Sequence, residues 1–152
     1  PGSLRTREPF LAQRFVQSRV GSWQFIDDTY NANPVSMAQS IREAERIAQG
    51  RRLVLVLGEM RELGEDSARA HRELGELVAT TAATHCFFHG RHAADVQAGL
   101  GGYGGAFRAV NAAEDLLQAV ADLRGEDGVM LFKGSRGCRM EHYYSFMERA
   151  WA

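Results

Sequence analysis

The sequence predicts a single α/β domain with a Rossmann-like, doubly wound and mainly parallel sheet that carries helices on both faces. Short apolar runs alternate with stretches of helical period, the order expected when right-handed crossovers join parallel strands. The run Leu-Val-Leu-Val-Leu at 53–57 has no polar alternation, which is typical of a strand covered on both faces. No linker or repeat interrupts the pattern, and 152 residues is an ordinary size for one domain. We expect the domain to cover residues 4–152, because the Pro-Gly-Ser before it looks like a remnant of tag removal.

Five short apolar runs have the length of strands, and polar or turn-forming residues bound each of them. We expect strands at residues 20–26, 53–57, 85–88, 107–110 and 129–132. The segment 99–105 is rich in glycine, but it lacks the Gly-x-Gly-x-x-Gly order of a dinucleotide fingerprint. We therefore interpret that segment as a surface loop.

The stretches between these runs carry apolar residues at helical spacing. We expect helices at residues 34–48, 67–81, 93–100, 111–123 and 139–150. Asn33 and Pro34 are typical of the cap and the first residue of the first helix, and Gly50 is typical of the residue that closes it. Asn111 is expected to cap the fourth helix.

The composition excludes several classes of function. With 18 basic and 19 acidic residues the net charge is −1, so the chain lacks the positive surface that nucleic acids or acidic membranes require. The longest apolar runs are too short to cross a bilayer, and the first residues lack the apolar segment of a signal peptide. The two cysteines, Cys86 and Cys138, are isolated in the sequence, which predicts neither a disulfide framework nor a zinc site. A reducing, cytoplasmic setting is the default expectation.

A cluster of carboxylates and amides follows the first expected strand. Residues 27–34 read Asp-Asp-Thr-Tyr-Asn-Ala-Asn-Pro and lead into a helix. In open α/β sheets, ligands bind beyond the carboxyl ends of the strands and beside such helix N-termini. These side chains can bind sugar hydroxyls, a base edge or a phosphate. The alternative is that Asp27 and Asp28 only form a turn and that Asn33 is only a cap.

Two further strand ends carry polar motifs. Residues 57–64 read Leu-Gly-Glu-Met-Arg-Glu-Leu-Gly, and Ser67 and His71 follow in the next helix. Residues 132–137 read Phe-Lys-Gly-Ser-Arg-Gly, just before the last helix. Glycines that permit close backbone approach, together with two cations, are typical of an anion site, although both cations can equally be solvated loop charges. In a parallel sheet all three motifs should line the same edge.

Together the three motifs resemble the C-terminal domain of the Mur ligases, in their order and in their spacing. The similarity extends from about Arg14 to the C-terminus. Within the family, the Tyr-Asn-Ala-Asn core and the Glu-Met-x-Glu-Leu-Gly loop are most similar to the members that add D-alanyl-D-alanine to the UDP-N-acetylmuramoyl-tripeptide of peptidoglycan synthesis. The resemblance implies an ATP-dependent amide ligase with an N-terminal domain for the UDP-sugar, a central P-loop domain and a Rossmann-like C-terminal domain. That last domain closes over the ATP and helps to bind the incoming dipeptide.

The resemblance also implies the chemistry. ATP phosphorylates the carboxylate of the nucleotide-peptide, magnesium neutralises the phosphates, and the amine of the dipeptide attacks the acyl phosphate. This sequence contains no Gly-x-x-x-x-Gly-Lys-Ser/Thr loop. We therefore expect ATP and Mg²⁺ to be cofactors of the longer enzyme, neither of them held firmly by this chain, and we expect no turnover from this chain alone. The expected partners are the N-terminal and central domains of the same polypeptide and the two substrates.

The resemblance assigns two sets of site residues and no catalytic residue or metal ligand. Asp28 matches the family's carboxylate that binds the ribose of ATP. The full set expected at the ATP is Asp28, Arg14, Asn31 and Asn33. The set expected at the incoming substrate is Lys133, Ser135, Arg136 and Glu59. Glu59 can bind the ammonium group of the dipeptide or can order its own loop, and ordering is the preferred interpretation.

Some alternatives stay open at this point. His85, His89 and His92 have some character of metal ligands, but a strand does not bring residues four positions apart together, so we expect no metal site there. His71 either contacts the preceding loop or lies partly exposed at the surface. The chain can also be a stand-alone module that binds a nucleotide or a phosphometabolite. A small oxidoreductase is disfavoured, because the glycine fingerprint is missing after the first strand.

Overall fold

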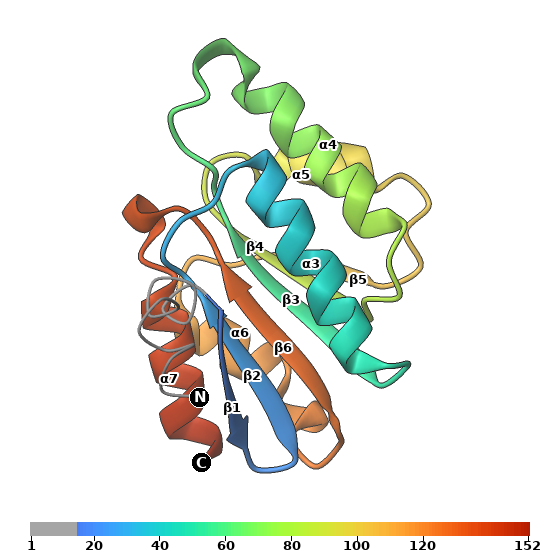
Figure 1. Cartoon of the computed structure of the whole chain (residues 1–152), viewed down its shortest axis with the longest axis vertical. Coiled ribbons are helices and arrows are strands. Elements are labelled where there is room, and N and C mark those ends of the chain that lie inside the picture. Colours follow the sequence, from blue (N-terminus) through green and yellow to red (C-terminus); the bar gives the residue numbers. More distant parts are fainter. Residues whose placement is uncertain (1–14) are drawn as a thin grey trace, which may run out of the picture.

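Six strands form one sheet within residues 15–152, the residues that the structure, a computed structural model, describes. Their order in the sheet is β1-β2-β6-β3-β4-β5. The strands are β1 (Val16–Val20), β2 (Trp23–Asp28), β3 (Arg52–Gly58), β4 (His85–His89), β5 (Ala106–Ala109) and β6 (Gly128–Lys133). β1 is antiparallel to β2, and the other neighbouring strands are parallel. The expected mainly parallel α/β sheet is confirmed (Figure 1).

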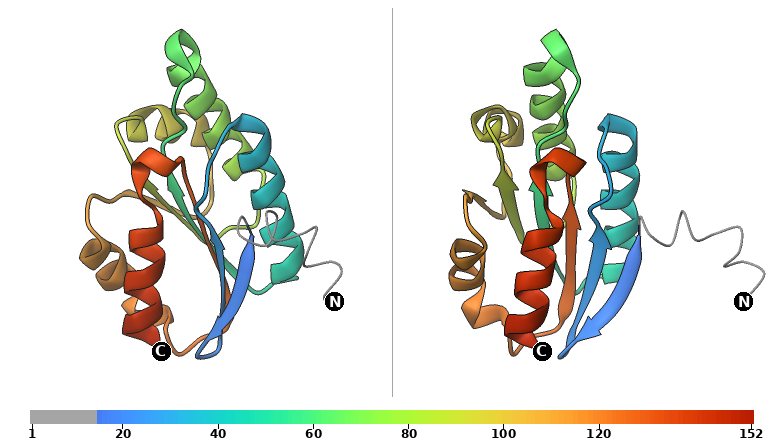
Figure 2. Two further views of the ribbon diagram at one scale, coloured as in Figure 1. Left: turned by 60° about the vertical axis from the view of Figure 1, so that its left-hand side comes forward. Right: turned by 90° about the vertical axis from the view of Figure 1, so that its left-hand side faces the viewer.

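Helices cover both faces of this sheet, as expected. The α-helices of the described residues are α3 (Pro34–Ala48), α4 (Ser67–Ala79), α5 (Ala93–Leu100), α6 (Ala113–Ala119) and α7 (Glu141–Trp151). Short 3₁₀ turns are η1 (Gly64–Asp66), η2 (Ala121–Leu123) and η3 (Arg136–Cys138). In the left-hand view of Figure 2, α3 lies on one side of the sheet, and α6 and α7 lie on the other. The buried residues separate accordingly into one cluster with α3, α4 and α5 and another with α6 and α7.

β3 is buried on both of its faces. Leu53, Leu55 and Leu57 belong to the cluster on the α3 side, whereas Val54 and Val56 belong to the cluster on the α7 side. All five side chains are at most 1% exposed. Burial of each such side chain contributes about 1.5–3 kcal/mol. The unbroken apolar run in the sequence is therefore explained by two covered faces.

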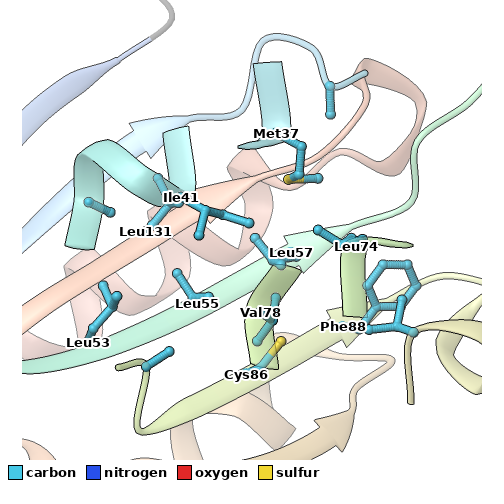
Figure 3. Packing of buried hydrophobic residues seen from close by; sticks show 14 of the residues in the cluster. Met37, Ile41, Leu53, Leu55, Leu57, Leu74, Val78, Cys86, Phe88 and Leu131 are labelled. Carbon is cyan, nitrogen blue, oxygen red and sulfur yellow. The ribbon is translucent and has the colours of Figure 1, made fainter. Parts of the chain in front are cut away.

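The cluster on the α3 side joins two helices to the sheet (Figure 3). Ile41 of α3 lies beside Leu131 of β6, and Leu74 of α4 lies near Phe88 of β4. This packing fixes α3 against the sheet with its N-terminus at the edge where the parallel strands end.

The expectation of a single first strand at 20–26 is wrong. A tight turn separates β1 from β2, and its Gly21 has a φ of 63°, a conformation that favours glycine. β1 is an edge strand whose Val16 is 41% exposed, so it lacks the strong apolar pattern of the central strands. The apolar residues on both sides of the turn therefore read as one strand in the sequence.

The expected cap at Asn111 is also wrong. The N-cap of α6 is Ala112, and no side chain caps that end. α6 ends at Ala119, and the rest of the expected helix forms η2. The other expected strands and helices are present, with small shifts at their ends.

The chain leaves the neighbouring strands β2 and β6 toward opposite faces of the sheet. β2 leads to α3 on one face, and β6 leads through η3 to α7 on the other. Such a divergence opens a crevice at the carboxyl edge, where ligands bind in open α/β sheets. The last residues of these two strands, Asp28 and Lys133, are direct partners in the register.

Candidate functional site

The three polar motifs of the sequence meet at one edge of the sheet. The adjacent parallel strands β2, β6 and β3 end there, at Asp28, Lys133 and Gly58. The loops after β6 and β3 touch: a Cβ on Gly134 would lie 2.9 Å from the Cα of Gly58, so glycine is required for this approach. The N–H of Ser135 donates to the carbonyl of Glu59 at 3.1 Å. The expectation of one shared edge is confirmed.

Asp28 and Lys133 form a buried ion pair at this edge. Lys133 Nζ lies 3.0 Å from Asp28 Oδ2, and each residue is 3% exposed. The hydroxyl of Ser40, on α3, donates to the same carboxylate oxygen. Lys133 Nζ also donates to the backbone carbonyl of Asn31 at 2.9 Å. The ammonium group thereby joins β2, β6 and the loop that leads to α3.

The carboxyl group of Asp28 keeps one oxygen for a ligand. Burial raises the pKa of Asp28 above its ordinary value, and the Ser40 hydroxyl and the Lys133 ammonium group oppose that shift. Both of these partners contact Oδ2, and no partner among residues 15–152 contacts Oδ1. Oδ1 therefore retains its capacity to accept hydrogen bonds from outside the domain.

A cavity of about 400 Å³ lies at the N-terminus of α3. It brings together three of the four residues expected at the ATP. Its lining is Phe15, Asp28, Asn31, Asn33, Ser36, Gln39, Ser40, Glu43 and Lys133. Arg14 lies outside the described residues, although its neighbour Phe15 lines the cavity. The volume is within the range of small-molecule sites, and the polar lining suits a sugar or a nucleoside.

Asn33 and Asn31 organise the start of α3. Asn33 Oδ1 accepts from the N–H of Ser36 at 2.8 Å, and the Asn33 N–H donates to Ser36 Oγ at 3.1 Å, which completes a capping box. Asn31 Oδ1 accepts from the N–H of Ala32 at 2.8 Å. The expected cap at Asn33 is confirmed. Neither side-chain amide N–H₂ has a partner within the described residues, so both remain available as donors at the cavity.

The loop after β6 does not gather its residues around one anion. Lys133 directs its charge to Asp28, and Ser135 is 4% exposed with its Oγ 3.2 Å from Cys138 Sγ. Arg136 is exposed, and its guanidinium group lies 4.9 Å from the centre of the Tyr30 ring. Of the three loop residues expected at the substrate, Arg136 is the one whose charge faces solvent.

Glu59 lines a second cavity, of about 790 Å³, formed by the loop after β3 and the segment after β4. Its backbone N–H donates to the carbonyl of His89 at 3.1 Å, which ties the two loops together. Its side chain is buried, and Oε1 accepts from the N–H of Arg91 at 3.5 Å. These contacts support the ordering role, and the position in the cavity leaves the carboxylate within reach of a ligand.

His71 is a buried residue that holds the loop after β3. It is 0% exposed, its Nε2 accepts from the N–H of Met60 at 3.0 Å, and its Nδ1 donates to the carbonyl of Ser67 at 2.7 Å. Burial lowers its pKa below the ordinary value of histidine. Of the two roles left open for His71, contact with the loop is confirmed and surface exposure is wrong.

The three other histidines near strand ends bind different partners. His85 pairs with Thr84, His89 with Val110 and Tyr143, and His92 with Ser67 and Asp95. In the part of the chain that the structure describes, no group of three His, Cys, Asp or Glu residues has the geometry to hold a metal ion. No helix among the described residues is long and apolar enough to cross a membrane.

Sequence reasoning missed Ser40. It lies on the buried face of α3 with Met37, Ile41 and Ala44, and it is 8% exposed. A hydroxyl on an otherwise apolar helix face was the available signal, because a buried polar group needs a partner. The partner, Asp28, lies 12 residues away in the sequence.

Comparison with known proteins decides the family. The model of the family described as "Mur ligase, glutamate ligase domain" matches residues 13–136. The chain belongs to the Mur ligase family. The UDP-N-acetylmuramoyl-tripeptide–D-alanyl-D-alanine ligase of Bacillus subtilis is 34% identical over 118 residues, which cover 76% of this chain and 26% of that protein.

Solved structures of this family have the same fold. The crystal structure of the MurF ligase of Thermotoga maritima in complex with ADP aligns with a TM-score of 0.75 at 28% identity, over 90% of this chain and 30% of that one. MurF of Acinetobacter baumannii aligns with a TM-score of 0.73 at 28% identity, over 91% of this chain and 30% of that one. The chain thus spans less than a third of the length of these relatives. The expected resemblance to a domain of a Mur ligase, and to the MurF type in particular, is confirmed.

Proposed function

We propose that this chain is the C-terminal domain of a MurF-type ligase, which uses ATP to join D-alanyl-D-alanine to the UDP-N-acetylmuramoyl-tripeptide. Family membership and the names of the similar proteins support the reaction class. The domain extends over residues 4–152, and the first three residues are a tag remnant. The missing N-terminal and central domains of the same polypeptide hold the UDP-sugar and the phosphates of ATP.

The observation that carries the proposal is the orientation of Asp28 at the cavity beside α3. Ser40 and Lys133 both hold Oδ2, which leaves Oδ1 as an acceptor for the hydroxyls of the ATP ribose. Asn31 and Asn33 line the same cavity with amide groups that have no acceptor among the described residues, and Arg14, outside that range, is assigned by the resemblance. These four residues form the domain's share of the nucleotide site.

The incoming dipeptide binds at the loop after β6. Arg136 is exposed and suits the carboxylate of the dipeptide, because a guanidinium group forms bidentate hydrogen bonds with carboxylates. Lys133 and Ser135 act indirectly, by fixing Asp28 and by shaping the loop. Glu59 lines the neighbouring cavity, where a carboxylate suits an ammonium group.

The chain alone forms no amide in this account. Its sequence has no P-loop to hold the phosphates of ATP. A cytoplasmic location accords with the two buried, unpaired cysteines. Amide formation from ATP and both substrates by the purified 152-residue chain would contradict this part of the proposal.

Calorimetric titration tests the nucleotide assignment. We expect weak binding of ATP to the chain, with loss of that binding in Asp28→Ala and in the more conservative Asp28→Asn. The neighbouring carboxylate provides the control: Asp27→Asn should bind ATP as the wild type does, because Asp27 bonds to Thr29 and does not line the cavity. Equal ATP affinity in Asp28→Asn and wild type would refute the role of Asp28.

A stand-alone module that binds a nucleotide or phosphometabolite is the second candidate, because residues of this chain alone line the cavity beside α3. The natural reading frame distinguishes the two candidates. A P-loop domain encoded upstream of Leu4 supports the ligase, and a natural start at this point supports the module.

A further inference from the structure

The second cavity contains a chain of three hydrogen-bonded side chains that the sequence did not reveal. The hydroxyl of Ser67, at the start of α4, lies 3.0 Å from His92 Nε2. His92 Nδ1 lies 2.8 Å from a carboxylate oxygen of Asp95, in the first turn of α5. Ser67 and His92 both line the cavity of about 790 Å³. The carboxylate of Asp95 therefore orients the imidazole of His92, and the imidazole can accept a proton through the hydroxyl of Ser67.

The hydrogen bonds define the tautomer of the neutral imidazole. A carboxylate can only accept, so His92 donates Nδ1–H to Asp95. In the neutral ring, Nε2 carries the lone pair and accepts the hydroxyl proton of Ser67. The basic nitrogen of His92 is therefore bonded to a hydroxyl that lines the same cavity.

Glu59 supplies a negative charge in the same cavity without a close partner for that charge. Its side chain is 7% exposed, yet its nearest cation is Arg91, with Nε at 3.7 Å, and the neutral His92 lies with Nε2 at 3.8 Å. The Arg91 side chain is itself 88% exposed. Buried carboxylates are ordinarily held by short hydrogen bonds. A carboxylate with only long contacts, in a cavity beside a proton acceptor, fits the ammonium group of a ligand.

We propose that this cavity receives the ammonium group of the incoming dipeptide and that the Ser67–His92–Asp95 chain accepts its proton. The inference rests on the proposed ligase function and adds the group that makes the amine nucleophilic. An α-ammonium group has a pKa near 8, so at neutral pH it must lose a proton before it can attack. His92 takes that proton through Ser67, while Glu59 holds the ammonium group and Asp95 positions the imidazole.

Proton transfer and amide formation conserve atoms and charge. The ammonium group gives one proton to the imidazole, and the resulting amine attacks the carbonyl carbon of the acyl phosphate. A C–N bond forms and the C–O bond to the phosphoryl group breaks. The second proton of the nitrogen leaves with the departing phosphate as HPO₄²⁻, and the imidazolium returns its proton to solvent.

Several charged or titratable groups face His92. The ring of His71 stacks on it with 4.4 Å between the ring centres. Burial lowers the pKa of His71 and so favours the neutral form of His71. Glu59 and Asp95 are the facing carboxylates, and Arg91 is the facing cation. The pH dependence of the amide step therefore reports this group of residues together.

The test uses the full-length ligase that carries this domain, because two steps must be separated. ADP release in a single turnover without dipeptide measures acyl phosphate formation, and product formation with D-alanyl-D-alanine measures the amide step. At pH 7 we expect His92→Gln to keep the ADP burst and to slow the amide step by about 10²–10⁴-fold, the range typical of proton transfer by a side chain. Asp95→Asn and Ser67→Ala should slow the same step less.

The loss in His92→Gln should shrink as the pH rises above 8, because more of the dipeptide then arrives as free amine. His142→Gln is the matched control and should keep both rates, since this exposed histidine lies on α7, outside the cavity. A wild-type amide rate in His92→Gln, or a loss that is the same at every pH, would overturn the inference alone. A wild-type enzyme that forms no amide with D-alanyl-D-alanine would overturn the ligase proposal and this inference with it.

Discussion

Asp28 and Lys133 lie 105 residues apart in the sequence and meet at 3.0 Å in the interior, as the last residues of adjacent strands. Ser40 completes the arrangement from α3. The pair and Ser40 occupy Oδ2 of Asp28, and Oδ1 has no hydrogen-bond partner among the described residues. The nucleotide assignment depends on this relationship.

The first prediction concerns the energy of the pair. Lys133→Met leaves the Asp28 carboxylate buried without its partner, and we expect a loss of about 3–5 kcal/mol in the free energy of unfolding. Urea denaturation measures it. The double variant Asp28→Leu/Lys133→Met should lose less than the sum of the single variants, because neither charge is then left alone.

The control for this measurement is the surface pair of Arg69 and Asp66, at 3.0 Å with side chains 61% and 62% exposed. Arg69→Met should cost no more than about 1 kcal/mol, since water screens an exposed pair. Equal losses in Lys133→Met and Arg69→Met would show that burial of the Asp28 pair has no energetic consequence.

The second prediction concerns the carboxyl group itself. Burial raises the pKa of Asp28, and the hydrogen bond from Ser40 opposes the shift. Ser40→Ala removes that donor, so the pKa should rise further above the ordinary 3.8. NMR titration of the carboxyl carbon measures the change. Ser36→Ala, on the same helix but without contact to Asp28, should leave the pKa of Asp28 unaltered.

The third prediction concerns the cap of α3. Asn33→Ala removes the acceptor for the Ser36 N–H and should lower the free energy of unfolding by about 1 kcal/mol. Asn33→Asp keeps an acceptor at this position and should retain most of that stability. Thermal unfolding distinguishes them; an Asn33→Ala protein as stable as the wild type would mean that the capping box contributes nothing.

The fourth prediction concerns the loss of folding stability at acidic pH. The unfolded chain takes up a proton on His71 near pH 6.5, whereas burial lowers the pKa of the folded state. Between the pKa of His71 in the folded state and its pKa in the unfolded state, the unfolded state binds more protons. The contribution of neutral His71 to the free energy of unfolding is therefore complete above pH 6.5 and is lost as the pH falls. The slope is at most about 1.4 kcal/mol per pH unit.

Urea denaturation at several pH values measures this slope. Burial also lowers the pKa of His85, which adds a slope of its own. His71→Gln should therefore reduce the pH dependence without abolishing it. An unchanged slope in His71→Gln would show that protonation of this residue is not linked to unfolding.

The sequence predicts the parallel sheet and its shared polar edge because apolar runs, glycines and helix signals are local. The pairing of Asp28 with Lys133 depends on strand order and register, which bring distant residues together and leave no local trace.

The edge strand β1 was missed because exposure removes its apolar signal. Asn111 was wrongly expected to cap, because a residue type typical of caps does not determine where a helix starts. The Ser67–His92 contact was missed for the same reason as the ion pair, because it joins α4 to the start of α5, whereas His92 and Asp95 are neighbours at the start of one helix.

The most direct test of the central claim compares ADP with 2′,3′-dideoxy-ADP by amide NMR shifts of the labelled chain. ADP should shift signals of Asp28, Asn31 and Ser40 at the cavity beside α3, and the dideoxy analogue should shift them much less, because it lacks the hydroxyls that Oδ1 accepts. Equal shifts with both nucleotides, or shifts gathered away from this cavity, would contradict the assignment of Asp28 as the ribose ligand.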